Sequence, residues 1–527
     1  MGQAELLIAG LLVAVAGLSA LARRMSVPYP IVLVVGGALF GFVPGIHAIK
    51  LNPSVVLVVF LPPLVYSAAF FANLGDIRAN MRGITLSSVG LVLATMVAVA
   101  VTAHALIGGM SWPAAFALGA VVSPTDPLAG ASIMRRLEFP RRMVSSIEAE
   151  GLFNDATALV AYKVAVAAVL SGSFSLLNAG WRFLAGAAGG VAIGLVVGWV
   201  VAEVRKRTED AQTSITISLF SGYAAFVPAD RLGASGVLAA VTTGIYMGVR
   251  GPSIIPARIR LQGFFVWEML NFILNASLFV LVGLQLRTVV QALSGVPAAS
   301  LVRYAVAISA VVIVARLVWF FTVPYLIRAM DRRPSQRARR VGAGPRLVIA
   351  WAGMRGSVSL AAALALPLRT NAGARFPERD LIIFLTFSVI FATLVLQGLS
   401  LPKLIRRLGI ARDGSEDREE LRARLVAIKA ALAQLDVLER EEWTREDTIE
   451  RMRRLYDYRK RRFAARAGKI EDDGYEDRSL AYQQLLQLVL GAQRDALVRM
   501  RDSGELSNEA MNQVIRELDL EESRLEI

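Results

Sequence analysis

Long apolar segments recur through the first 410 residues, and this feature limits the possible folds more than any other. A helix of about 20 apolar residues spans the ~30 Å hydrocarbon core of a bilayer. The mean hydropathy of +0.53 is too high for an ordinary soluble protein. We therefore predict an all-α polytopic membrane protein with about thirteen transmembrane helices. The predicted segments lie near residues 5–22, 27–45, 51–72, 83–107, 112–134, 143–170, 181–203, 212–229, 233–249, 263–286, 300–328, 344–368 and 380–405.

Basic residues in the connecting loops predict how these segments are oriented. If the N-terminus is outside, the first six inner loops hold 21 Arg and Lys residues, whereas the outer loops and their helix ends hold 8. Such an excess marks the cytoplasmic side of a membrane protein. An odd number of segments then places the C-terminal part in the cytoplasm. The basic residues in these loops explain the net charge of +15. The positive charge of the chain therefore does not indicate nucleic-acid binding.

The charge density changes near residue 410. Residues 1–410 predict a transmembrane domain, whereas nearly every third residue of 411–527 is charged and predicts a helical cytoplasmic domain. Helices are expected near residues 417–439, 444–467, 476–502 and 507–525. Packing, dimer contact and regulation are all open as roles for this second domain.

Two of the predicted membrane segments contain residues that interrupt a helix. In "VVSPTDPLAG" (121–130) a proline stands on each side of Thr125 and Asp126, and each proline removes a backbone donor. In "WAGMRGSVSLA" (351–361) a glycine stands on each side of Arg355. Interrupted helices at membrane depth line cavities and hold ions, and one in each half of a chain points to an inverted-repeat transporter. The alternative for the first motif is a proline kink that Asp126 caps.

The hexapeptide "EGLFND" places polar residues on two faces of the predicted helix over 143–170. Glu150 and Asn154 are four residues apart and share one face, whereas Asp155 points away from them, above Gly151. The buried cation that we expect to meet the first face is Arg316, in the middle of the predicted segment over 300–328. We expect Asp155 to open onto a cavity instead.

These motifs resemble those of the monovalent cation:proton antiporter 1 family, in its bacterial branch of sodium/proton antiporters. "SPTDP", "EGLFND", "IVAR" and "GMRGSVSLA" occur in the family's order, and "FLPPLVYSAA" (60–69) is also similar. The resemblance implies a homodimer in the bacterial inner membrane, with two inverted repeats and a core of two crossed, broken helices. It further implies exchange of a monovalent cation for protons, without a cofactor.

The resemblance also implies roles for individual residues. Asp155 would bind cation and proton in turn, and Asp126 and the Thr125 carbonyl would help to hold the cation. Asn154 stands where electrogenic relatives have a second Asp, which implies electroneutral exchange. Three further residues would support the site. Glu150 and Arg316 would form an ion pair that holds the core rigid, and Arg355 would lie near the second helix crossing.

Two positions depart from the family pattern. Gly151 replaces a Ser that many members have, and Ser67 replaces a Glu that some members have. Fewer protein oxygens would then coordinate the cation. The resemblance implies Na⁺, or else Li⁺, as the cation. The two departures keep K⁺/H⁺ antiport by the same mechanism open as an alternative.

Two other classes of membrane protein fit the residues less well. A cation channel would also use a polar helix break, but no filter-like repeat or ring of acidic residues is evident. An intramembrane enzyme would need a catalytic set such as Ser, His and Asp at membrane depth, and the chain has only His47 and His104, far apart. The chain has no cysteine, which excludes disulfides and thiolate metal sites.

Overall fold

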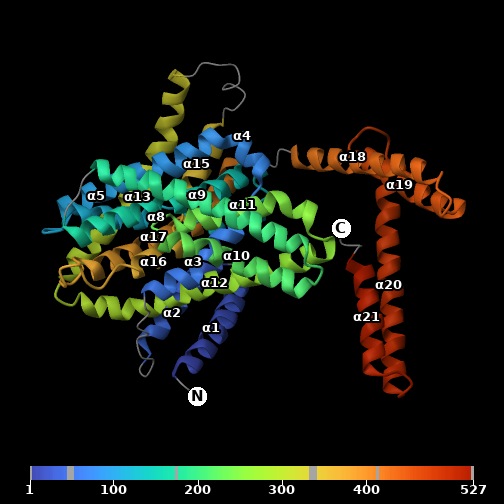
Figure 1. The fold of residues 1–527 in the computed structure, drawn as a ribbon, viewed down its shortest axis with the longest axis horizontal. Coiled ribbons are helices and arrows are strands. Elements are labelled where there is room, and N and C mark those ends of the chain that lie inside the picture. The colour runs from blue at the N-terminus through green and yellow to red at the C-terminus, as the bar shows by residue number, and fades with distance from the viewer. Residues whose placement is uncertain are drawn as a thin grey trace. The chain divides into compact units, whose positions relative to one another are not determined.

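The structure is a computed structural model that describes residues 3–25, 27–43, 53–172, 176–330, 341–410 and 415–523. Within these ranges the chain is helical and contains no strand (Figure 1). The chain divides into two compact units, Met1–Arg412 and Asp413–Ile527.

Each predicted apolar segment has a helical counterpart in the described part of the first unit. Six described helices are long and apolar enough to cross a membrane, namely Met81–Leu106, Met143–Ser171, Phe183–Lys206, Ala257–Ala292, Ala298–Ile327 and Arg379–Leu408. The predicted segment ends at 44–45 and 51–52 lie outside the described residues. The helices of the unit are α1 (Gln3–Met25), α2 (Tyr29–Phe42), α3 (Pro53–Phe70), α4 (Leu74–Thr85), η1 (Leu86–Leu91), α5 (Val92–Leu106), α6 (Trp112–Val122), α7 (Pro127–Arg136), α8 (Arg141–Ser171), α9 (Leu176–Lys206), α10 (Ala211–Arg231), α11 (Gly236–Ile254), α12 (Ala257–Ala292), α13 (Ala298–Met330), α15 (Ala343–Trp351), α16 (Ser357–Leu364) and α17 (Arg379–Leu408).

Two sets of helices can be told apart by their main contacts. In the first set, α8 packs mainly against α4, α6 and α7 and less extensively against α9 and α11. In the second set, α10 packs against α3, α9, α11 and α12. Helices α9 and α11 approach closely because α9 turns glycines toward α11. A Cβ atom at Gly194 would lie 2.5 Å from the Ala239 carbonyl oxygen, so only glycine allows this approach.

An ion pair links the two sets of helices. Lys163 of α8 contacts the carboxylate of Asp230, near the end of α10, and both side chains are about half exposed. Neither residue lines the cavity that is described below. The ion pair therefore joins α8 to α10 outside the lining of that cavity.

The two predicted helix interruptions are present, and they meet. The chain leaves helical geometry between α6 and α7 and again between α15 and α16. At the meeting point the Asp126 amide donates a hydrogen bond of 2.8 Å to the Met354 carbonyl oxygen. A Cβ atom at Gly356 would overlap the Asp126 carboxylate, so this residue has to be glycine for the main chains to come so close.

The described part of the second unit, residues 415–523, contains four helices at the positions that the charge pattern predicts. Neighbours along the chain contact one another in this unit. Arg494 of the third helix joins Asp519 and Glu522 of the fourth at 2.6 and 2.5 Å. The helices are α18 (Ser415–Leu438), α19 (Glu446–Arg466), α20 (Tyr475–Asp502) and α21 (Asn508–Ser523).

Candidate cation site

A cavity of about 410 Å³ lies in the first unit beside the meeting point of the two interrupted segments. Its wall comes from both sets of helices, with α3 and α12 facing α7, α8 and the start of α16. Four carboxylates line it, those of Asp126, Glu148, Asp155 and Glu268. An anionic cavity at a helix break is a suitable place for a cation.

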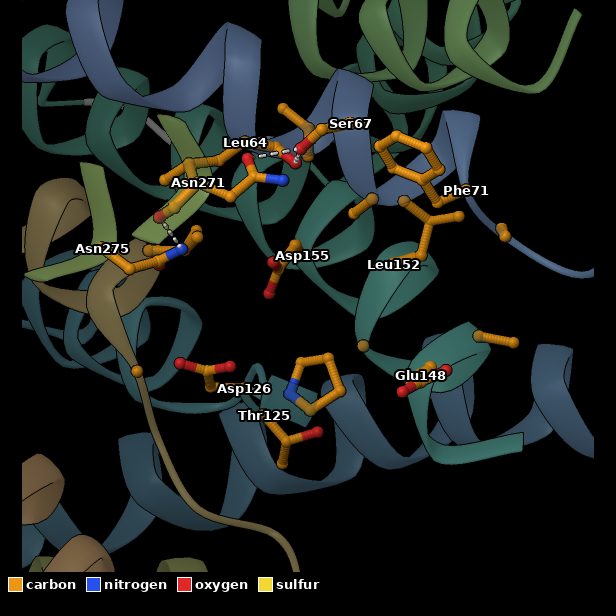
Figure 2. Close-up of a pocket in the computed structure, with 18 of the residues that line it drawn as sticks. Leu64, Ser67, Phe71, Thr125, Asp126, Glu148, Leu152, Asp155, Asn271 and Asn275 are labelled. Atoms are coloured by element: carbon orange, nitrogen blue, oxygen red, sulfur yellow. Dashed lines mark hydrogen bonds between the residues drawn. The ribbon is translucent and has the colours of Figure 1, made fainter. Parts of the chain in front are cut away.

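Asp155 and Asp126 approach the cavity from different elements. Figure 2 shows the Asp155 carboxylate pointing from α8 into the open space, with the Asp126 carboxylate on the far side of that space. Asp126 is the last residue before α7 begins at Pro127. Both side chains are partly exposed within the unit, so both are accessible from the cavity. The structure thus brings together the two carboxylates that the sequence singles out.

Thr125 and Asn154 hold the interrupted segment against α8. The Asn154 amide Nδ2 donates to the Thr125 hydroxyl at 2.8 Å and lies 3.5 Å from the Thr125 carbonyl oxygen. The Thr125 hydroxyl in turn donates to Glu150 Oε1 at 3.4 Å. The sequence interpretation, in which Asn154 and Glu150 share a buried cation, is therefore incomplete, because Asn154 bonds to Thr125 and not to Arg316.

Glu150 and Arg316 form the ion pair that the sequence favours. Arg316 Nη1 donates to Glu150 Oε1, and the exposed fractions of the two side chains are 1% and 5%. The remaining donors of Arg316 reach the last turn of α15, where Nε is 3.1 Å from the Ala350 oxygen and Nη2 is 3.3 Å from the Ile349 oxygen. The pair therefore ties α8, α13 and α15 together beneath the cavity wall.

Arg355 lies at the crossing, as predicted, and carbonyl oxygens surround its charge. Nε donates to the Val122 oxygen at 3.0 Å, and Nη1 donates to the Gly353 oxygen. The backbone amide of Arg355 donates to the Thr393 hydroxyl of α17 at 3.2 Å. Because α6 ends at Val122, this side chain satisfies a carbonyl that the interruption leaves without its helical partner.

The two departures from the family pattern have local structural explanations. A Cβ atom at Gly151 would lie 2.5 Å from the Cγ and Cδ atoms of Pro127, so the glycine lets α8 pack against the start of α7. Close packing therefore accounts for the absence of a hydroxyl-bearing side chain at this position. Ser67 lines the cavity from α3, and its hydroxyl lies 2.8 Å from Asn271 Oδ1 and 3.0 Å from the Leu64 oxygen.

The sequence interpretation missed a polar row on α12. Glu268, Asn271 and Asn275 all line the cavity on the side opposite α8, and Figure 2 shows the two asparagines. The Asn275 amide donates to the Asn271 carbonyl oxygen at 2.9 Å. The signal was present in "EMLNFILN", because spacings of three and four residues place these side chains on one face of an apolar helix.

Comparison with known proteins identifies the family. The family model described as "Sodium/hydrogen exchanger, transmembrane" matches residues 10–407. The chain belongs to this family. An uncharacterized Na⁺/H⁺ exchanger of Mycobacterium tuberculosis is 36% identical to this exchanger over 531 residues, which cover 98% of this chain and 97% of the relative.

Two further similarities add detail. A sodium, potassium, lithium and rubidium/H⁺ antiporter of Bacillus subtilis is 32% identical over 391 residues, which cover 72% of this exchanger and 58% of that antiporter. The structure of the sodium proton antiporter MjNhaP1 from Methanocaldococcus jannaschii at pH 8 matches with a TM-score of 0.58 at 16% identity. That match covers 77% of this chain and 99% of the other, and it supports the fold.

Family membership gives the class of activity. The exchanger is a membrane-spanning secondary transporter that exchanges cations for protons, and it is not an enzyme. It uses no cofactor, because the ions that it binds are its substrates.

Proposed function

We propose that the exchanger moves Na⁺ against H⁺, one for one, by alternating access at Asp155. Asp126 and the Thr125 carbonyl assist in binding the cation, while Glu150, Arg316 and Arg355 keep the crossing in place. The exchanger would work as a homodimer in the inner membrane of a bacterium, with its N-terminus outside and its C-terminal unit in the cytoplasm.

The observation that carries this proposal is the position of two carboxylates in one cavity at the helix crossing. A carboxylate there can be neutralised by a proton or by a cation, so the two ions compete for it. If only the neutralised site crosses the membrane, this competition couples the two fluxes. The cavity also reaches Arg135 and Glu148, which form an exposed ion pair of 2.5 Å at the predicted inner end of the unit. We therefore take the structure to be open inward.

Asn154 supports electroneutral exchange. Its amide carries no charge and is held by Thr125, so Asp155 is the acidic residue that "FND" contributes to the cavity. One Na⁺ against one H⁺ moves no net charge. In proteoliposomes, the rate of Na⁺-driven proton flux should therefore be the same with and without an imposed membrane potential.

The substitution Asp155→Asn tests the site. It should abolish Na⁺-dependent proton flux in proteoliposomes that carry an imposed pH gradient. The matched control is Asp210→Asn, an exposed N-cap of α10 whose carboxylate accepts from the Thr213 amide at 2.7 Å and which Asn replaces well. Full activity in the control with none in Asp155→Asn supports the assignment, whereas exchange in Asp155→Asn would overturn it.

A K⁺/H⁺ antiporter with the same mechanism is the second candidate. It is favoured by the tight packing at Gly151 and by the commitment of the Ser67 hydroxyl to Asn271 and Leu64, which leave the cation more water and fewer protein ligands. The similar antiporter of Bacillus subtilis has sodium, potassium, lithium and rubidium in its name. Parallel flux assays with Na⁺, Li⁺ and K⁺ decide between the cations. Uphill movement of the cation, driven by the pH gradient, would rule out a channel.

A further inference from the structure

Helix α20 has an apolar face that the rest of its own unit leaves exposed. Ser479 and Leu490 are buried on the side that packs within the unit. A different side of the helix presents Tyr482, Leu485 and Leu488 at 62%, 63% and 73% exposed fraction. At 100° per residue these side chains form one stripe about 120° wide. We call the following residues the α20 stripe: Ala481, Tyr482, Leu485, Leu488, Val489 and Ala492.

The sequence around the α20 stripe differs from the rest of the unit. Residues 479–493, "SLAYQQLLQLVLGAQ", contain no charged side chain, although about every third residue of the unit is charged. A solvent-facing helix surface normally carries charges. A continuous uncharged apolar stripe on such a unit therefore indicates a surface that a partner covers.

The charges at the two ends of the stripe indicate the partner. Arg478 and Asp495 lie equally far from its centre, which falls between Leu486 and Gln487, and both are exposed. In an antiparallel pair of α20 helices, Arg478 of each copy faces Asp495 of the other, and Asp477 comes within reach of Arg499. A parallel pair would place like charges opposite each other. We infer that α20 pairs antiparallel with α20 of a second copy of the chain, through the α20 stripe, in a two-fold contact.

A lipid surface fits the same stripe less well. Helices that lie in a membrane interface are rich in Lys and Arg on their polar face. In α20, the four arginines are matched by the four acidic residues Glu476, Asp477, Asp495 and Asp502. Arg494 is also committed to Asp519 and Glu522 of α21. Because α20 carries equal numbers of basic and acidic residues, a protein surface with the same balance of charges fits the stripe better than a lipid surface.

The chain has no native cysteine, so single cysteines can report the pairing in the full-length exchanger in its membrane. Leu488→Cys lies near the two-fold axis and should yield cross-linked dimers with a short bis-maleimide. Arg478→Cys alone should not, because the two copies of residue 478 are about 25 Å apart in an antiparallel pair, at 1.5 Å rise per residue. The double variant Arg478→Cys, Asp495→Cys should cross-link. Gln513→Cys, exposed on α21, is the matched control that stays monomeric.

The cross-linking pattern separates tail pairing from pairing of the membrane units. Adding Leu485→Glu to Leu488→Cys should lower the cross-linked fraction at least tenfold, because it buries a charge in each half of the contact. Failure of Leu488→Cys to form cross-linked dimers would overturn the inference. Cross-linking of Arg478→Cys alone would overturn the antiparallel register. None of these outcomes depends on which cation is transported.

Discussion

At the scale of single residues, Glu150 is the acidic partner of a fully buried arginine. Glu150→Gln would leave Arg316 with carbonyl oxygens but without a countercharge, and breaking a buried pair in this way costs about 3–5 kcal/mol. We expect a clear fall in the thermal unfolding midpoint in detergent, followed by tryptophan fluorescence. The control Glu148→Gln, on the same helix, removes a pair whose carboxylate and guanidinium are 35% and 67% exposed. Because such pairs contribute about 0–1 kcal/mol, an equal fall in both variants would contradict the structural role of Glu150.

Gly151 is the residue at which packing and ion coordination are hardest to separate. Restoring a hydroxyl with Gly151→Ser should reduce exchange and stability, because Pro127 occupies the space that the new Cβ needs. Overpacking of this kind costs about 1–3 kcal/mol. The control Gly83→Ser places a Cβ on α4 where nothing lies within 4 Å, so it should have little effect. Tighter Na⁺ binding with normal stability in Gly151→Ser would show that α8 can move away and that the glycine is only a missing ligand.

The sequence identifies some of the site residues for a clear physical reason and misses others. Asp126, Glu150 and Arg316 stand out because a charge in hydrocarbon needs a function or a partner. The bond between Asn154 and Thr125 could not be predicted, because it depends on how the interrupted segment turns after Pro124. The asparagines of α12 were overlooked because an amide in a long apolar helix is a weaker signal than a charge or a helix break.

At the scale of elements, the contact between Lys163 and Asp230 joins α8 to α10. The proposed alternating access requires the two sets of helices to move relative to each other, so this ion pair should stabilise the state in which the cavity is open. Lys163→Ala should shift the equilibrium away from that state by up to about fivefold, because half-exposed pairs contribute at most about 1 kcal/mol. The measurement is the rate at which a maleimide labels Ala72→Cys in the cavity wall, and the rate should fall. The charge-reversed double variant Lys163→Asp, Asp230→Lys should restore the original labelling rate. An unchanged labelling rate in Lys163→Ala would contradict the idea.

The contact between α19 and α20 should depend on pH. Hydrogen bonds of 3.1 and 3.2 Å from Arg462 hold the pKa of Glu476 below its ordinary value of 4.5. A lowered pKa in the folded state means that the contact contributes stability above pH 4.5 and loses it as the pH falls below that value. Hydrogen exchange at the start of α20 should therefore rise on acidification, with a change in protection worth up to about 1 kcal/mol. Glu476→Gln removes the titrating group, so the same step in that variant would assign it to another residue.

Helix positions followed from the sequence more closely than helix interruptions did. The prolines around Asp126 and the glycines around Arg355 marked two of the breaks, because both residue types act on the backbone itself. The π-helical stretch Leu86–Leu91 between α4 and α5 contains no proline, and its single glycine, Gly90, did not predict it. Its Ser88 hydroxyl donates to the Glu150 carbonyl oxygen at 3.3 Å, and its Gly90 faces Trp319 closely. The π-helical stretch thus contacts α8 and α13. These contacts cannot be predicted from the sequence of residues 86–91 alone.

At the scale of the whole molecule, the orientation predicted from loop charges can be tested with the cysteine-free chain. Gly108→Cys, in the turn before α6, should be labelled by an impermeant maleimide from outside the cell. Trp443→Cys, with an exposed fraction of 74%, should be labelled only after the membrane is opened. Labelling of both positions from the same side would contradict the thirteen-helix topology. The inverted repeat is likewise a prediction, because it concerns the relation between two halves whose sequences show no visible repetition.

The backbone hydrogen bond between Asp126 and Met354 has a consequence for how such an exchanger can change over time. The joint between the two interrupted helices is made by peptide groups, with a glycine where a side chain would intrude. Most substitutions in the cavity wall therefore leave the joint intact. Residues of α3 and α12 that line the cavity can therefore change while this backbone joint stays the same. If the cavity lining sets which ion is carried, a new transport specificity is accessible by single substitutions that leave the joint unchanged.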